Sequence, residues 1–432
     1  DLHSFPTRRS SDLHIAANFD IDATGTDTIT VTGSRVVNAI DVSSTEAATN
    51  LTREDLELLP VERDLLSVAA LAPGIQRGEF EGISFGGSSV AENTVYINGL
   101  NVTDFYRRIG SSSVPYAFYK EFQVKTGGYS VEFGRTTGGV INAVTRSGTN
   151  EFEFGTEVLW EPDFLQSEAS DHPGRVAQYD EYDRRHYNVY ASGPIVKDKL
   201  FFFALYEFRD YQPTNSSDAG DRLDVAREDD GFWGTKIDWQ INDRNLLELL
   251  AFSDDNTEVT DAYEFDPVSG VTTGFQNTIF DKSGGTNWAA TYTAYLTEKL
   301  SGKILYGENE REGSLTSAND QSCARIRDLR PNLGSPDLGC TSTAAITART
   351  DTREARRVDF EWDLGNHLLR FGLDHEINTS DHVQFYPGPE RLLYEVRRVA
   401  SPNLENGAPR PPAEFFFVRA RQNLYGDRKS VV

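Results

Sequence analysis

The chain has 432 residues and a formal net charge of −25, and this acidic balance argues against nucleic acid as a partner, because phosphate binding requires a basic surface. The chain is 38% hydrophobic and 11% aromatic, and no run approaches the roughly 18 apolar residues that a membrane helix requires. A mean hydropathy of −0.49 still permits a membrane β-barrel, whose strands need only about ten alternating residues each.

The two ends of the chain do not fit the sequence beside them. Asp1–Leu13 and Asp427–Val432 resemble translated sequencing-adapter reads, so both are left out of the fold reasoning. Ordinary tails are the alternative. The first segment is neutral and the second carries +1, which leaves −26 for the remainder. The adapter interpretation predicts a fragment of a longer gene, and it would account for the lack of a signal peptide.

The segment from residue 14 to residue 35 is polar and shows no core pattern, so we expect it to be flexible. Near its end lies a short β-prone string, in which two apolar residues alternate with threonines. This string consists of Asp27, Thr28, Ile29, Thr30, Val31, Thr32 and Gly33.

Residues 36–148 are predicted to form a small α/β domain. Thr52 stands three residues before Asp55, which is a helix start signal within Asn50–Pro60. A second short helix is expected over Arg63–Leu71. Short strands are expected at Ile83–Phe85, Thr94–Ile97, Glu121–Lys125 and Val140–Thr145, with a tight turn at Asn98-Gly99.

From Glu151 onward the hydrophobic period is two. In the first segment Phe154, Val158 and Trp160 fall on one side, and Glu153 and Glu157 fall on the other. Such strands fit a barrel wall with lipid outside and water inside, whereas a dry sandwich core would not accept the charges. Eleven segments are candidates: Glu151–Trp160, Arg185–Ser192, Lys199–Tyr211, Gly231–Ile241, Asn245–Ser253, Thr286–Leu296, Gly302–Glu310, Arg357–Leu364, His367–Asn378, Arg391–Arg398 and Ala413–Leu424.

The connections between these segments alternate in length, as they do in outer-membrane barrels. Short turns are expected at Gly193–Lys199, Asn242–Arg244, Thr297–Ser301 and Gly365–Asn366. Long polar loops are expected at Glu161–Arg184, Gln212–Asp230, Asp254–Gly285 and Arg311–Ala355. Because the first strand leaves the preceding domain on the periplasmic side, the long loops are expected outside the cell.

The last of these loops contains both cysteines of the chain, Cys323 and Cys340. Two cysteines in one polar segment favour a disulfide that closes a surface loop in an oxidising compartment, and two free thiols are the alternative. The sequence shows no metal-ligand spacing such as CxxC or HExxH, and it suggests no cofactor.

Several blocks resemble the TonB-dependent outer-membrane receptors, and most closely their Oar-like branch. The blocks are LTREDLELLPVERDLLSVAALAPGI, SFGGSSVAENTVYINGLNVTD, VKTGGYSVEFGRTTGGVINAVTRSGTNEFEFG and SGPIVKDKLFFFALYEFRD. The resemblance implies a mainly β protein, with residues 36–148 as a plug inside a transmembrane antiparallel barrel over residues 149–426. Plugged transporters of this kind have about 22 strands, so eleven candidates make about half a barrel.

The resemblance also implies partners: a TonB energy-transducing complex, outer-membrane lipid and an extracellular nutrient. Asp27–Gly33 is the candidate TonB box, which would bind by strand addition. Glu132 and Arg135 are candidates for a latch that pairs the plug with wall charges, and an ion pair within the plug or in solvent is the alternative.

The leading interpretation is energy-driven import of a bulky nutrient in a Gram-negative outer membrane. An Oar-like surface barrel with an adhesive or structural role is the second interpretation. An enzyme is disfavoured, because Gly82–Gly86 matches the GxSxG pattern without the strand-to-helix turn that it needs. Saccharide, peptide and iron chelate all remain open as cargo.

Overall fold

The computed structural model describes residues 47–57, 65–77, 82–134, 136–167, 170–171, 176–217, 221–329, 338–341, 343–398, 416–421 and 425–431. The chain divides into two units, Asp1–Val36 and Val37–Val432, and all of the described residues belong to the second. None of the helices among them has the length and apolar character needed to cross a membrane.

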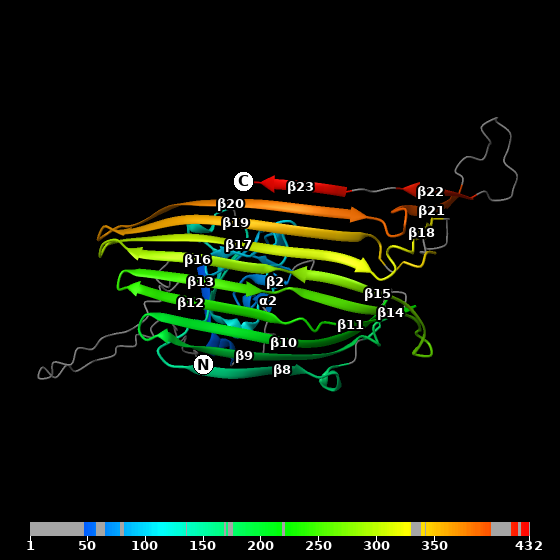
Figure 1. Cartoon of the computed structure of the whole chain (residues 1–432), viewed down its shortest axis with the longest axis horizontal. Coiled ribbons are helices and arrows are strands. Elements are labelled where there is room, and N and C mark those ends of the chain that lie inside the picture. Colours follow the sequence, from blue (N-terminus) through cyan, green and yellow to red (C-terminus); the bar gives the residue numbers. More distant parts are fainter. Residues whose placement is uncertain are drawn as a thin grey trace, which may run out of the picture. The chain divides into compact units, whose positions relative to one another are not determined.

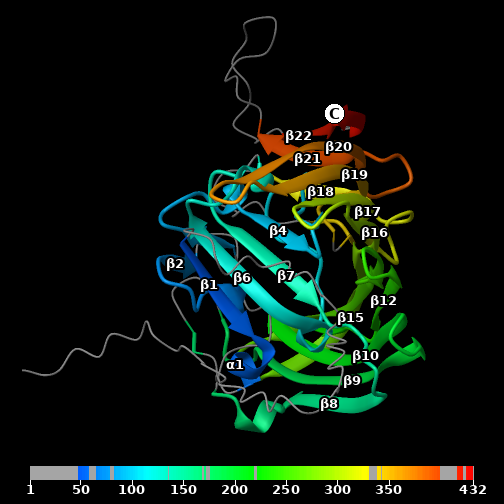
Figure 2. The ribbon, with the colours of Figure 1, turned by 90° about the vertical axis from the view of Figure 1, so that its left-hand side faces the viewer.

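The first part of this second unit is a five-stranded sheet in the order β1-β6-β7-β4-β5, where only the β4–β7 pairing is parallel (Figure 2). Its strands are β1 (Ala47–Thr52), β4 (Thr94–Ile97), β5 (Leu100–Asn101), β6 (Tyr119–Gly127) and β7 (Val140–Thr145). It also contains two short α-helices, α1 (Arg53–Glu57) and α2 (Leu65–Ala69), the strand pair β2 (Ile75–Arg77) and β3 (Ile83–Phe85), and the 3-10 helices η2 (Val90–Glu92), η3 (Tyr116–Phe118) and η4 (Val131–Phe133). We call this part the plug.

Local sequence chemistry explains two features of the plug, and both predictions are confirmed. Asp55 accepts hydrogen bonds from the Thr52 amide at 2.9 Å and from the Thr52 hydroxyl at 2.7 Å, which fixes the start of α1. These hydrogen bonds lower the pKa of Asp55. Asn98 and Gly99 have φ values of 49° and 87°, as a tight two-residue hairpin turn requires.

The second part is a large antiparallel sheet that curves around the plug, which we call the wall (Figures 1 and 2). Its strands are β8 (Glu153–Glu161), β9 (Glu181–Val196), β10 (Leu200–Ser216), β11 (Arg222–Arg227), β12 (Phe232–Asn242), β13 (Asn245–Ser253), β14 (Asn256–Asp266), β15 (Val271–Gly284), β16 (Thr286–Tyr295), β17 (Leu300–Ser317), β19 (Ile346–Asp363), β20 (Leu368–Phe385) and β23 (Tyr425–Val431). Within the described residues, no pairing joins β8 to β23, so the wall is a partial barrel.

The two faces of the wall differ in the way that the alternation predicts. Phe154, Trp160 and Trp239 point away from the plug and are 76%, 53% and 46% exposed. Lys236 and Arg353 point inward and are buried against the plug. An apolar outer face and a charged inner face suit a strand between lipid and an aqueous lumen.

Two of the predicted long loops are wrong, because Gln212–Asp230 and Asp254–Gly285 consist largely of strand. β11 continues into β12, β13 into β14 and β15 into β16 after short breaks, so the wall extends past the predicted ends of its strands (Figure 1). Antiparallel backbone pairing continues through these extensions. Residues 267–270 form the short turn between β14 and β15.

The last two predicted wall strands are also misplaced. β21 (Leu393–Arg398) and β22 (Phe416–Arg421) form a separate three-stranded sheet with β18 (Arg325–Asp328). The neighbour of β20 is instead β23, which includes most of the adapter-like segment Asp427–Val432. Strand pairing uses backbone groups, so the foreign origin of this segment stays a prediction.

Candidate functional site: the plug–wall interface

The plug meets the wall beside β10, β12 and β13 through a dry aromatic cluster. Phe118, which precedes β6, lies 5.8 Å from Phe203, 5.5 Å from Phe232 and 6.3 Å from Phe252, measured between ring centroids. All four side chains are fully buried. Burial of the adjacent Tyr119 raises the pKa of its hydroxyl far above the usual value. Apolar packing therefore holds this side of the plug, which we call the aromatic anchor.

The link from plug to wall is fixed next to this anchor. The Arg146 guanidinium lies over the Tyr190 ring at 4.0 Å and the Phe203 ring at 4.7 Å. Ser147 accepts a hydrogen bond of 3.0 Å from Lys236 Nζ, and Lys236 also pairs with Glu248 at 3.0 Å. The residues immediately after β7 are thus held to the inner face of the wall.

On the β19 side the plug is held by three arginines of one strand. Arg349, Arg353 and Arg357 are spaced four residues apart, so they share the inward face of β19. Each contacts a different plug group: the carboxylate of Asp104, two backbone carbonyls and the carboxylate of Glu132. We call these three residues the arginine row.

The central member of the arginine row has the most extensive contacts. Arg353, 3% exposed, donates from Nη1 to the carbonyls of Asn101 and Thr103 at 2.9 Å each. Its Nε lies 3.6 Å from Glu376 on β20, and Glu376 accepts a hydrogen bond of 3.2 Å from the side-chain Nδ2 of Asn101. Loss of this guanidinium would leave buried carbonyls and a carboxylate without their partner.

The predicted latch residue Glu132 does face the wall, where it lies 3.4 Å from Arg357 Nη2. Arg357 also pairs with Asp359 at 2.6 Å. The other predicted latch residue, Arg135, lies outside the described residues, so its role stays a prediction. The same holds for the candidate TonB box, Asp27–Gly33.

A further ion pair joins the start of the plug to the first wall strand. Arg53, the first residue of α1, donates from Nη2 to Glu157 on β8 at 3.1 Å. The backbone amide of Ser113 donates a hydrogen bond of 2.6 Å to the side-chain carboxylate of Asp254, at the break between β13 and β14. Sequence reasoning missed these contacts and the arginine row, although four-residue spacing on a period-two strand marks the row as a single face.

A cavity of about 600 Å³ lies between the plug and the wall at β19 and β20. Its lining combines charged side chains, among them Glu132, Arg353 and Arg357, with aromatic ones such as Phe105 and Phe360. The plug is therefore packed tightly at the aromatic anchor and loosely at the arginine row.

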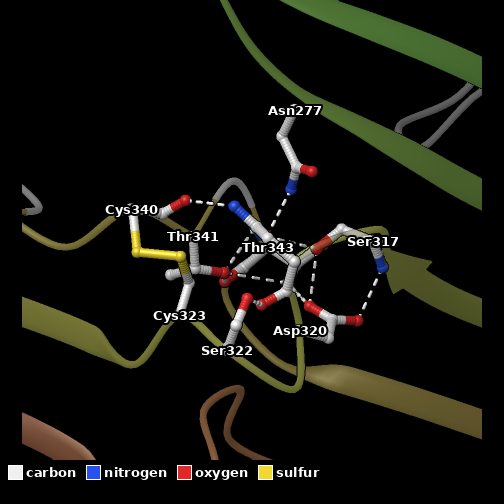
Figure 3. Close-up of a disulfide and its surroundings, with 9 residues drawn as sticks. Asn277, Ser317, Asp320, Ser322, Cys323, Cys340, Thr341 and Thr343 are labelled. Atoms are coloured by element: carbon white, nitrogen blue, oxygen red, sulfur yellow. Dashed lines mark hydrogen bonds between the residues drawn. A yellow bond between two sulfur atoms is a disulfide. The ribbon is translucent and has the colours of Figure 1, made fainter.

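Far from the plug, Cys323 and Cys340 form a disulfide in the connection between β17 and β19 (Figure 3). The carboxylate of Asp320 accepts hydrogen bonds from Ser317 and Thr343, at 2.6 and 2.9 Å for the two hydroxyls (Figure 3). Asn277 of β15 donates to Asn319, and the amide of Gly388 donates to the Asp320 carbonyl at 2.6 Å. Hydrogen bonds thus connect the segment around the disulfide, between β17 and β19, to β15 and to the residues that follow β20.

Comparisons with known proteins agree with this architecture. Residues 41–140 match the TonB-dependent Receptor Plug Domain family. The TonB-dependent transporter Oar of Myxococcus xanthus is 36% identical over 195 residues, which cover 42% of this chain and 18% of the relative. The probable TonB-dependent siderophore receptor PirA of Acinetobacter baumannii is 25% identical over 333 residues, which cover 65% of this chain and 41% of the relative.

Among solved structures, the outer membrane transporter YddB from Escherichia coli superposes with a TM-score of 0.60 at 15% identity, covering 89% of this chain and 54% of that one. At this identity the likeness concerns the fold. The chain spans less than half the length of both curated relatives. With a plug sheet, an antiparallel wall that is apolar on its outer face and these matches, the chain belongs to the TonB-dependent receptor family.

Proposed function

We propose that this chain is the plug-bearing part of a transporter in the outer membrane of a Gram-negative bacterium, and that it imports a bulky nutrient. The observation that carries the proposal is the asymmetric plug–wall interface. One side is an apolar anchor, and the other is a row of ion pairs and hydrogen bonds beside a cavity that charged and apolar side chains line together. Water can replace polar contacts more readily than it can enter a dry aromatic cluster.

The outer membrane has neither ATP nor an ion gradient, so the work must come from the inner membrane through TonB. Asp27–Gly33 would bind TonB by strand addition, in which main-chain hydrogen bonds supply the affinity. β1 follows the box and lies at the edge of the plug sheet, where it pairs with β6. A pull on the box would therefore load β1 first, and then the Arg53–Glu157 pair.

Glu132 is proposed as a latch together with Arg357, and Arg135 as a second latch residue. An ion pair that is partly exposed contributes only about 0.2–1 kcal/mol, so a moderate force can break it. The arginine row then becomes the surface along which a path opens. Support for the adhesive alternative is weaker, because adhesion needs neither a removable plug nor a TonB box.

The name of the relative PirA favours ferric siderophores as the cargo class, with saccharides and peptides as the other candidates. The test is uptake by cells that express the complete receptor with or without Asp27–Gly33, supplied with a panel from each class. Surface display is followed by an epitope placed after Val268, which is 93% exposed at a hairpin tip. Deletion of the box should abolish uptake at equal display, and unchanged uptake would refute the importer.

A further inference from the structure

Asp104, at the tip of the plug, uses its two carboxylate oxygens for different purposes. Oδ1 accepts hydrogen bonds from the amides of Tyr106 at 2.9 Å and Arg107 at 2.8 Å, which closes a compact plug loop. Oδ2 accepts from Arg349 Nη2 at 3.2 Å and lies 3.7 Å from Arg311 Nε, on the wall. Asp104 is 2% exposed. One carboxylate thus both shapes the plug loop and ties it to the wall.

The two arginines that hold Asp104 have more donors than the described residues satisfy. Arg311 and Arg349 have side chains that are 16% and 8% exposed. Nonetheless Nε and Nη1 of Arg311 and Nη1 of Arg349 are buried without a hydrogen-bond acceptor in the described part of the chain. Buried donors of this kind carry a desolvation cost, which an additional oxygen ligand would remove.

Contacts within the wall help to position the arginine pair, although the Arg349 guanidinium also lies 5.0 Å from the ring of Tyr106 in the plug loop. Arg349 Nε pairs with Asp351 on the same strand at 3.0 Å, and Arg311 lies opposite Asp351 in the register of β17 and β19. A guanidinium fork matches the geometry of a carboxylate. The pair therefore constitutes a prearranged anion subsite in which Asp104 is the present occupant.

We propose that Arg311 and Arg349 form a subsite for a carboxylate group of the incoming solute, and that this group displaces Asp104. The inference rests on the proposed function and adds the chemical class of the cargo. The incoming carboxylate would take over the contacts of Asp104 Oδ2 with the two arginines, while Oδ1 can still close the plug loop. Occupation of the subsite would release the plug tip from the wall, so that ligand binding is sensed by the plug.

The acidic net charge of the chain limits this proposal to solutes that carry a small negative charge. A net charge of −25 disfavours strongly anionic solutes, while a local arginine pair can attract one or two carboxylates. The cargo class is accordingly a solute that bears a few carboxylates and otherwise neutral groups.

The test measures calorimetric binding of tricarballylate to the purified receptor, with the corresponding triamide as the uncharged control. Asp104→Asn removes the internal competitor, so we expect affinity for tricarballylate to rise by about tenfold or more. Asp104→Ser retains a hydroxyl that can accept the hydrogen bonds that close the plug loop. Its affinity for tricarballylate should rise in the same way. Arg349→Gln should abolish binding. Arg356→Gln, on the same strand but facing outward with a 56% exposed side chain, should leave binding unchanged.

Unchanged or weaker tricarballylate binding by both Asp104 variants would overturn the proposal, and so would equal binding of the triamide. The outcome can be separated from that of the proposed function. Deletion of Asp27–Gly33 should abolish uptake without altering tricarballylate binding, because the box acts after the ligand is bound. If deletion of the box abolishes uptake but the Asp104 variants do not bind tricarballylate more tightly, the subsite is refuted and the proposed function is not.

Discussion

The ring of Phe118 in the plug lies 5.8 Å from the ring of Phe203 in the wall, and both side chains are 0% exposed. A plug that must move is therefore joined to its barrel through a fully desolvated contact at one side. The opposite side, at β19 and β20, is joined through charges and hydrogen bonds next to a cavity. The two sides should respond differently to substitution.

Phe118→Ala is expected to destabilise the plug–wall interface by about 3–5 kcal/mol, because it removes a buried aromatic side chain and leaves a cavity. Hydrogen exchange of the amides of β6 and β7 would measure the loss. Phe164→Ala is the matched control, since Phe164 is 72% exposed in the connection after β8. Equal protection in both variants would contradict the aromatic anchor.

Arg353→Met is expected to loosen the plug tip by about 3 kcal/mol, since it leaves Glu376 as a buried charge without its guanidinium and frees two plug carbonyls. Exchange of the amides between Asn101 and Arg108 should speed up accordingly. Arg356→Gln, three residues further on the outward face, should change stability by less than about 0.5 kcal/mol. If both variants exchange alike, the arginine row does not hold the plug.

The latch pair should show a small coupling. A double-mutant cycle with Glu132→Gln and Arg357→Gln should give about 0.2–1 kcal/mol, because the Glu132 side chain is 36% exposed and the distance is 3.4 Å. Plug opening measured by hydrogen exchange supplies the four free energies. A coupling free energy of several kcal/mol would mean that the pair acts as a desolvated ion pair. A coupling free energy of zero would mean that Glu132 does not act as a latch.

Replacing Cys323 by serine should loosen the loop that joins β17 to β19. The disulfide closes a segment with a sequence separation of 17, for which chain entropy predicts about 3 kcal/mol. That corresponds to roughly a hundredfold faster opening, which exchange of the Ala318 and Gly388 amides would report. The plug amides serve as the internal control, and they should not change.

Acid should weaken the start of α1. Hydrogen bonds from Thr52 lower the pKa of Asp55 in the folded plug, so their stabilisation is present above the unfolded pKa of aspartate and is lost as the pH falls through the folded value. Exchange of the α1 amides should therefore rise below about pH 4. In Thr52→Val this pH dependence should become smaller, because the hydroxyl donor is lost while the backbone amide still donates to Asp55. A similar acid response in that variant would assign the effect to another group.

Local chemistry made some of this structure predictable. The Thr52–Asp55 pair and the Asn98-Gly99 turn depend on neighbours within three residues, and both are found as expected. The wall strands are predictable where one face meets lipid and alternation is strong. Asn256–Asp266 lacks an apolar face of that kind, so its composition resembles a loop although it forms β14.

Contacts between residues that are distant in the sequence could not be predicted from the sequence. Glu132 could be singled out as a latch candidate, but its contact Arg357 lies 225 residues away. Asp104 and Arg349 are 245 residues apart, and neither has a local signature of pairing. Only the curvature of the wall around the plug brings such groups together, and that curvature depends on register between many strands.

The bent strands set the mechanics of the receptor's rim. Because β11, β14 and β15 are hydrogen-bonded to one another and to β10 and β17, this part of the rim is a continuous sheet instead of a set of independent loops. It cannot fold over a captured solute strand by strand. An inward swing would also have to bend β10 and β17, which continue into the rim without a break, so the rim is stiffened by the strands on both of its sides.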